Sequence, residues 1–196
     1  MDKYIYLLIS LLLLTVWLVV FLCLKSVSRK ILIKVSITGG LAGLVSEFWY
    51  FKDYWHPPSL FGSAIISLED FLFGFAFTGI AANIYGLIFE KGNKKYAKGH
   101  KIIFLILFIA GVFSLLLFTN LNINSIFVSS FAFLLFSFIM IFIRKDLVAQ
   151  SIMSGVLSLL VIIPIYILLF NFISPDYWDT YWLLKNTAFG LKIIGN

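Results

Sequence analysis

Three carboxyl side chains lie within or directly beside long apolar runs of the chain. Glu69 and Asp70 precede the apolar run 71–79, and Glu47 lies inside another run. A charged carboxylate without a partner is costly in the hydrocarbon of a bilayer, so such residues are rare there and usually functional. They are candidates for donating or accepting a proton. For Glu69 and Asp70 a second explanation stays open, because acidic residues also cap the positive end of a helix.

Glu47 shares a helical face with small residues. Ser36, Gly40, Gly43 and Glu47 recur at helical spacing, and the pattern Gly39-x-x-x-Gly43 favours close contact between helices. Glu47 is therefore predicted to face a neighbouring helix rather than lipid. There it is either a catalytic group or a buried hydrogen-bonding partner between helices.

Polar and aromatic side chains that could surround a substrate lie near these acids. Asn83 follows Glu69 by fourteen residues, close to four turns, and is predicted on the same side of that helix. Aromatic faces stabilise cations, so the aromatic segment 49–58 could line a site where a cationic intermediate forms. The candidates for binding a substrate are Trp49, Tyr50, Asp53, Trp55, Phe73 and Asn83.

Each of these candidates also has a structural explanation. Trp and Tyr are enriched where helices meet the membrane surface. Asp53 and His56 could hold the loop by local hydrogen bonds, and Asn83 could hydrogen-bond a neighbouring helix. The sequence has no His-x-x-x-His pattern and a single cysteine, so no metal site is expected.

The elements that must position these residues are membrane helices. Of 196 residues 62% are hydrophobic and only 12% are charged, too few for the surface of a soluble domain. Several apolar runs reach the roughly 20 residues that cross a bilayer. We therefore predict an all-α integral membrane protein with about six transmembrane helices. The predicted ranges are 4–24, 31–51, 65–89, 102–119, 125–143 and 150–172.

The basic residues alternate between the predicted loops. Eleven of the fifteen Lys and Arg residues fall in or beside the first, third and fifth loops. The positive-inside rule then places those loops in the cytoplasm and the N-terminus outside, in a multi-pass protein of the cell membrane. Orientation explains the net charge of +6, so nucleic-acid binding is not expected.

An internal repeat divides the chain. Residues 29–44 read RKILIKVSITGGLAGL and residues 144–159 read RKDLVAQSIMSGVLSL, identical at seven of sixteen aligned positions without a gap. Each copy continues with Asp-Tyr-Trp, at 53–55 and 176–178, and then with Phe-Gly-x-x-Ile-Ile. This order predicts a parallel 3+1+3 repeat, with a first three-helix repeat at 1–90, a linker helix within 91–120 and an incomplete second repeat at 121–196.

The second copy lacks an acidic motif. Ile65-Ile66 is followed by Ser67-Leu68-Glu69-Asp70, whereas Ile193-Ile194 is followed only by Gly195-Asn196. The chain is therefore predicted to be truncated at the start of a seventh helix, or to have lost that helix.

Two strings of residues resemble a known family. Trp49-Tyr50-Phe51-Lys52-Asp53-Tyr54-Trp55-x-Pro57 and Ser67-Leu68-Glu69-Asp70-Phe71-Leu72-Phe73-Gly74-Phe75 are similar to the lycopene cyclase domain family of small, flavin-independent membrane cyclases. The resemblance covers both copies of the repeat. It departs from the family's Pro-x-Glu-Glu type motif at Ser67, which replaces the proline, and at Asp70, which replaces the second acid.

The resemblance implies an isomerase, a lycopene β-cyclase-like intramolecular lyase of carotenoid biosynthesis that needs no cofactor. A carboxyl that keeps its proton near neutral pH, an effect of removal from water, protonates a terminal double bond. The resemblance implies Glu69 as this acid, with Asp70 or Glu47 as its partner or as the proton acceptor. The implied partners are a lipid-soluble polyene, membrane lipid, and a second chain or oligomer that supplies the missing half-site.

Two alternatives to this enzyme remain. One is a noncatalytic membrane partner subunit, which the incomplete second copy would suit. The other is a small-solute transporter, because a 3+1+3 layout also occurs in sugar transporters, although these need a more polar cavity.

Overall fold

The computed structural model describes residues 2–62, 65–89, 109, 111 and 123–183, and within these ranges the chain is helical and contains no strand. Five of the described helical segments are long and apolar enough to cross a membrane. The segments are Asp2–Cys23, Ser26–Asp53, Leu68–Ile88, Ser125–Ile143 and Lys145–Ile173. The protein is thus an α-helical protein with the composition of a membrane protein.

The helices follow the predicted ranges closely. They are η1 (Asp2–Tyr4), α1 (Ile5–Cys23), α2 (Ser26–Asp53), α3 (Leu68–Ile88), α5 (Ser125–Ile143), η2 (Lys145–Leu147), α6 (Val148–Ile167), the π-helix η3 (Leu168–Ile173) and α7 (Tyr177–Tyr181). Most of the predicted helix 102–119, and the predicted start of a seventh helix, lie outside the described residues.

Two helix starts differ from the prediction by three residues or more. α2 begins five residues earlier, at Ser26, so Arg29 and Lys30 lie in its first turns rather than in a loop. Lys and Arg are good helix formers, and their long side chains can reach the membrane surface from a helix end. α3 begins three residues later, at Leu68, because Ser67 and Asp70 form a capping box that fixes the start of the helix.

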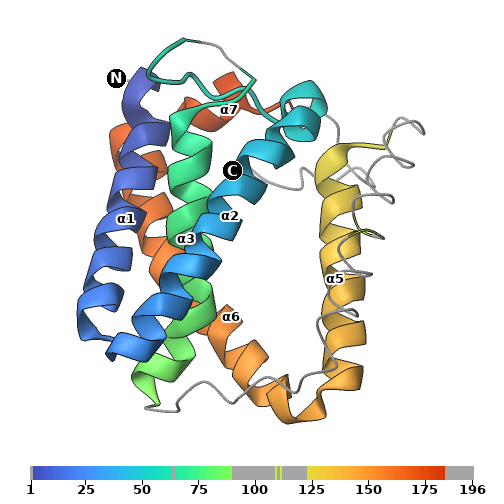
Figure 1. The fold of residues 1–196 in the computed structure, drawn as a ribbon. Coiled ribbons are helices and arrows are strands. Elements are labelled where there is room, and N and C mark those ends of the chain that lie inside the picture. The colour runs from blue at the N-terminus through green and yellow to red at the C-terminus, as the bar shows by residue number, and fades with distance from the viewer. Residues whose placement is uncertain (1, 63–64, 90–108, 110, 112–122, 184–196) are drawn as a thin grey trace. The chain divides into compact units, whose positions relative to one another are not determined.

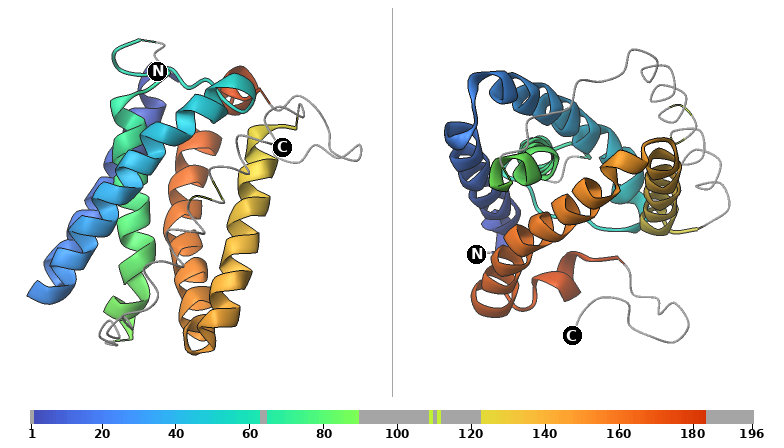
Figure 2. Two further views of the ribbon diagram at one scale, coloured as in Figure 1. Left: turned by 45° about the vertical axis from the view of Figure 1, so that its right-hand side comes forward. Right: turned by 90° about the horizontal axis from the view of Figure 1, so that it is seen from below.

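The described helices belong to two compact units, residues 1–92 with 152–196, and residues 93–151. In the first unit α3 packs against both α1 and α2, and the end of α6 adds to the same core (Figure 1). Seen from below, α3 lies between α1 and α2 (Figure 2). In the second unit, Arg144 forms an ion pair with Asp146 at 2.8 Å just after α5.

The small residues of α2 bring its backbone against α3. A Cβ atom added at Gly43 would lie 2.5 Å from the carbonyl oxygen of Asp70, and one added at Gly74 would lie 2.5 Å from that of Gly39. Glycine at such positions lets two helices approach more closely than any larger residue allows. The predicted contact face of α2 is thus confirmed, and it sets the start of α3 beside Glu47.

Candidate functional site

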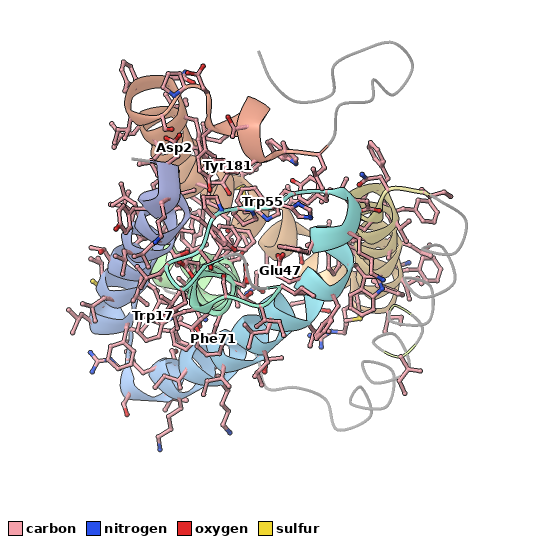
Figure 3. All side chains as sticks on the ribbon, turned by 90° about the horizontal axis from the view of Figure 1, so that it is seen from above. Asp2, Trp17, Glu47, Trp55, Phe71 and Tyr181 are labelled. Carbon is pink, nitrogen blue, oxygen red and sulfur yellow. The ribbon has the colours of Figure 1, made fainter. Side chains whose placement is uncertain are left out.

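A cavity of about 200 Å³ opens in the first unit, between α1, α2, α3 and the end of α6. Eight aromatic side chains and two carboxyl groups, those of Glu47 and Asp70, line it. The aromatic residues are Tyr6, Tyr50, Tyr54, Trp55, Phe73, Tyr166, Phe170 and Trp182. Figure 3 looks down on this region and labels Glu47 on α2 and Trp55 in the loop that follows α2.

Asp70 is buried and held by hydrogen bonds on both oxygens. Its Oδ1 accepts a hydrogen bond of 2.7 Å from the Tyr6 hydroxyl. Its Oδ2 accepts two hydrogen bonds of 2.7 Å, from the backbone N–H and from the hydroxyl of Ser67. The capping role considered for Asp70 is therefore confirmed, and the same side chain also lines the cavity.

Glu47 is only 5% exposed and lines the same cavity. The hydrogen bond between helices that was one explanation for Glu47 is not found among the described residues. A carboxyl removed from water usually has a hydrogen-bonding partner, and one without such a partner is available to a ligand. Within the described part of the chain, Glu47 is thus the acid that lines the cavity without a hydrogen bond to another residue.

Glu69 is fully buried, but it does not line the cavity. Its Oε1 accepts a hydrogen bond of 2.6 Å from the backbone N–H of Leu60, and the Ser10 hydroxyl donates to its backbone carbonyl at 3.2 Å. Its Oε2 has no hydrogen-bonding partner in the described part of the chain. Successive residues of a helix point about 100° apart, so Glu69 and Asp70 face different neighbours.

The other predicted site residues also divide into those that line the cavity and those that do not. Tyr50, Trp55 and Phe73 line the cavity, whereas Trp49, Asp53 and Asn83 do not. Asn83 is buried, and its amide donates to the carbonyl of Gly79 on its own helix at 3.0 Å. It lies about 20 Å along α3 from Asp70, at 1.5 Å per residue, so the structure does not bring it to the acids.

The sequence did not point to four of the aromatic cavity residues, Tyr6, Tyr166, Phe170 and Trp182, and it included Tyr54 only as part of the segment 49–58. Trp55 and Trp182 form an antiparallel bridge, in which Leu183 N–H donates to Tyr54 at 2.8 Å and His56 N–H donates to Tyr181 at 2.9 Å. The second Asp-Tyr-Trp string, at 176–178, lies just before Trp182 in the chain. It was the sequence signal that could have pointed to Trp182 as the aromatic partner of Trp55.

Tyr54, in the loop after α2, contributes an uncharged side chain to the aromatic wall of the cavity. Burial raises the pKa of the Tyr54 phenol well above its ordinary value, so this group stays protonated and can donate a hydrogen bond. No group of three or more His, Cys, Asp or Glu side chains that could hold a metal ion occurs in the described ranges. The cavity is therefore an apolar, aromatic chamber with two acids in its wall.

Comparisons with known proteins add no relative to this picture. No family model matches the chain, and no curated protein or solved structure matches it either. The cavity and its acids thus carry the functional argument.

Proposed function

We propose that the chain is a membrane enzyme of the lycopene cyclase type, which closes the end of a linear polyene into a ring by acid-initiated isomerisation. The observation that carries the proposal is the cavity itself, in which the carboxyls of Glu47 and Asp70 share an aromatic wall. An apolar polyene would enter such a chamber from lipid, and rings such as Trp55 and Phe73 would stabilise a cation inside it.

The reaction balances without a cofactor. A carboxyl protonates the terminal double bond, the next double bond attacks the resulting carbocation to form the ring bond, and loss of a proton restores a double bond. The product is an isomer of the substrate, and the proton is returned. The aromatic wall and the Asp70 carboxyl would stabilise the positive charge between these steps.

The geometry favours Glu47 as the proton donor. A general acid must come within hydrogen-bonding reach of the atom that it protonates, and Glu47 faces the cavity without a hydrogen-bonding partner in the described residues. The resemblance instead gives the role to Glu69, which does not line the cavity. Asp70, fixed by Tyr6 and Ser67, is suited to act as the nearby charge.

The test is cyclisation in a lycopene-making host. The chain is expressed alone and, separately, with a second chain carrying an acidic half-motif of the lycopene cyclase type, and the pigments are separated by chromatography. Cyclic product in either case supports the proposal. Its absence in both, with the protein present in the membrane, would favour the noncatalytic subunit or the transporter.

The proposal includes the membrane topology and the repeat. We propose six spans, a parallel 3+1+3 arrangement, an outside N-terminus and a cytoplasmic 91–101 loop, from the asymmetry of basic residues. Labelling of a cysteine placed at Lys95 by a reagent that cannot cross the membrane of intact cells would contradict this orientation.

A further inference from the structure

The aromatic cavity of the first unit has acidic groups in its wall but no basic ones. Glu47 and Asp70 line it, and no Lys, Arg or His occurs among the described residues that do so. Both acids are almost fully buried, at 5% and 4% exposed. A carboxyl that is removed from water and has no cationic neighbour in the wall must be balanced by a proton or by a positively charged ligand.

Three hydrogen bonds stabilise the charged form of Asp70. The Tyr6 hydroxyl, the Ser67 hydroxyl and the Ser67 backbone N–H all donate to its two oxygens, each at 2.7 Å. A carboxylate can only accept hydrogen bonds, so three donors around it suit the ionised group. Asp70 therefore contributes a fixed acceptor of negative charge to the cavity wall.

The rings of the cavity wall are inclined to one another at steep angles. Tyr6 and Trp55 meet edge to face, with ring centroids 5.0 Å apart and ring planes at 82°. Tyr54 and Trp182 meet in the same manner, at 5.3 Å and 65°. Rings inclined in this way turn their faces in different directions around one space. The face of an aromatic ring attracts cations, and proteins recognise quaternary ammonium ligands with several such rings.

The cavity suits a small ligand near the end of the helices, which Figure 3 shows from above. Its volume is about 200 Å³. A cavity of about 150 Å³ already holds benzene, and choline is only slightly larger. Tyr6 and Asp70 lie in the first turns of α1 and α3, and Glu47 lies about 9 Å before the end of α2, at 1.5 Å per residue. With these helices in a membrane, the site would lie close to the lipid headgroups.

We propose that this cavity binds a small quaternary ammonium group, with the positive charge beside Glu47 and Asp70 and the alkyl groups against the surrounding rings. The group belongs either to a dissolved choline-like compound or to the headgroup of a lipid such as phosphatidylcholine. Its connection with catalysis rests on the proposed function, because an ammonium ion places its charge in the cavity where the carbocation would form. Glu47 can donate a proton to an uncharged substrate and, once ionised, pair with a cation, so the two uses are compatible.

The test is the binding of choline, measured by calorimetric titration of the full chain in an uncharged detergent. Dimethylbutanol, in which a carbon atom replaces the nitrogen of choline, has the same shape without the charge and is the control ligand. Glu47→Gln removes the charge of the side chain but keeps its size. Asp53→Asn, at the end of the same helix and off the cavity lining, is the matched control variant.

We expect the wild type and Asp53→Asn to bind choline equally, and Glu47→Gln to bind it about 10²-fold more weakly, as for the loss of an ion pair partly removed from water. Dimethylbutanol should not bind measurably. Absence of choline binding, equally tight binding of dimethylbutanol, or a Glu47→Gln protein that binds choline like the wild type would each overturn the proposal. Should Glu47→Gln fail to fold, the comparison of the two ligands on the wild type still decides.

Two further measurements identify the source of the ammonium group and separate this site from the enzyme. Choline binding is repeated in lipid discs of phosphatidylcholine and of digalactosyl diacylglycerol, an uncharged lipid without an ammonium group. Weaker binding in phosphatidylcholine would support a lipid headgroup as the ligand, and equal binding would support a dissolved compound. Choline binding without cyclic product in the lycopene-making host would keep the site and remove the cyclase, whereas cyclic product without choline binding would overturn this inference alone.

Discussion

The two carboxyl groups at the start of α3, those of Glu69 and Asp70, differ in the hydrogen bonds that hold them. On the cavity side, both oxygens of Asp70 are occupied by hydrogen bonds from Tyr6 and Ser67. On the other side, Glu69 has one hydrogen bond, from Leu60, and one oxygen without a partner in the described residues. Both side chains are buried, so exposure does not distinguish them.

Asp70 is thus held in place by hydrogen bonds on both of its oxygens, whereas Glu69 is held on only one. Asp70 has little freedom to rotate without breaking hydrogen bonds, and each such loss in a buried setting is costly. One oxygen of Glu69, like the carboxyl of Glu47 in the cavity, has no hydrogen-bonding partner among the described residues. The cavity therefore combines one carboxyl held by the fold, that of Asp70, with one that has no hydrogen bond among the described residues, that of Glu47.

The largest expected effect is on Glu47. Glu47→Gln keeps the size of the side chain but removes its transferable proton, so cyclisation should fall by about 10²–10⁴-fold. Product formed by equal amounts of membrane-inserted protein is the measurement, and Glu69→Gln is the matched comparison. A larger loss in Glu69→Gln than in Glu47→Gln would assign the acid to Glu69, as the family resemblance implies.

The next largest effect is expected at Tyr6, whose hydroxyl helps to hold the Asp70 side chain. Tyr6→Phe removes the hydroxyl that donates to Asp70 and should lower the free energy of unfolding by about 1.5–3 kcal/mol, the range for a hydrogen bond to a charged group. Denaturant titration of the protein in detergent micelles measures this loss. Tyr4→Phe, at an exposed tyrosine two residues away, should change stability little. Equal stability of the two variants would show that Asp70 does not depend on Tyr6.

The backbone contact beneath Asp70 gives a smaller effect. Gly43→Ala places a Cβ atom 2.5 Å from the Asp70 carbonyl oxygen, so α2 and α3 must separate, at a cost of about 1–3 kcal/mol. Gly155→Ala is the control, because no described atom lies within 4 Å of its Cβ position. Alanine favours a helix over glycine, so this control should be neutral or stabilising. Thermal unfolding of both variants in the same detergent is the measurement, and a stable Gly43→Ala protein would contradict the close approach.

The smallest expected effect is on the cap. Ser67→Ala removes one of the two hydrogen bonds to Asp70 Oδ2 and the acceptor for the Asp70 N–H, and should cost about 1 kcal/mol. Hydrogen exchange of the first turn of α3 should quicken. No change there would mean that Tyr6 and the Ser67 backbone N–H fix Asp70 without help from the Ser67 hydroxyl.

Much of this arrangement could be predicted from the sequence, because lipid-crossing length and small-residue spacing are local signals. The ranges of α1 and α5, the inward position of Glu47 and the contact face of α2 follow from them. The matching small-residue contact expected around Gly155 is not seen among the described residues. The predicted repeat and topology stay predictions.

The cavity wall could be predicted only in part. Tyr50, Trp55 and Phe73 lie near the acids in the sequence and were anticipated. Tyr6 and Trp182 come from distant segments, and a helix that is apolar on all sides gives no periodic signal of which face meets the site. Asn83 was misjudged for a related reason, because sharing a side of a helix does not bring two residues together when several turns separate them.

The π-helix at the end of α6 makes the site sensitive to the number of residues in the chain. A π turn holds more residues than an α turn, and such turns often occur at functional sites. Within η3, Leu169 and Phe170 are buried, and Phe170 reaches the cavity. Deleting a single residue there would restore α-helical spacing and rotate everything that follows by about 100°. Tyr177 and Trp182 would then leave their partners, so we expect homologues of this chain to tolerate insertions in the loops but to keep the length of the 168–173 segment unchanged.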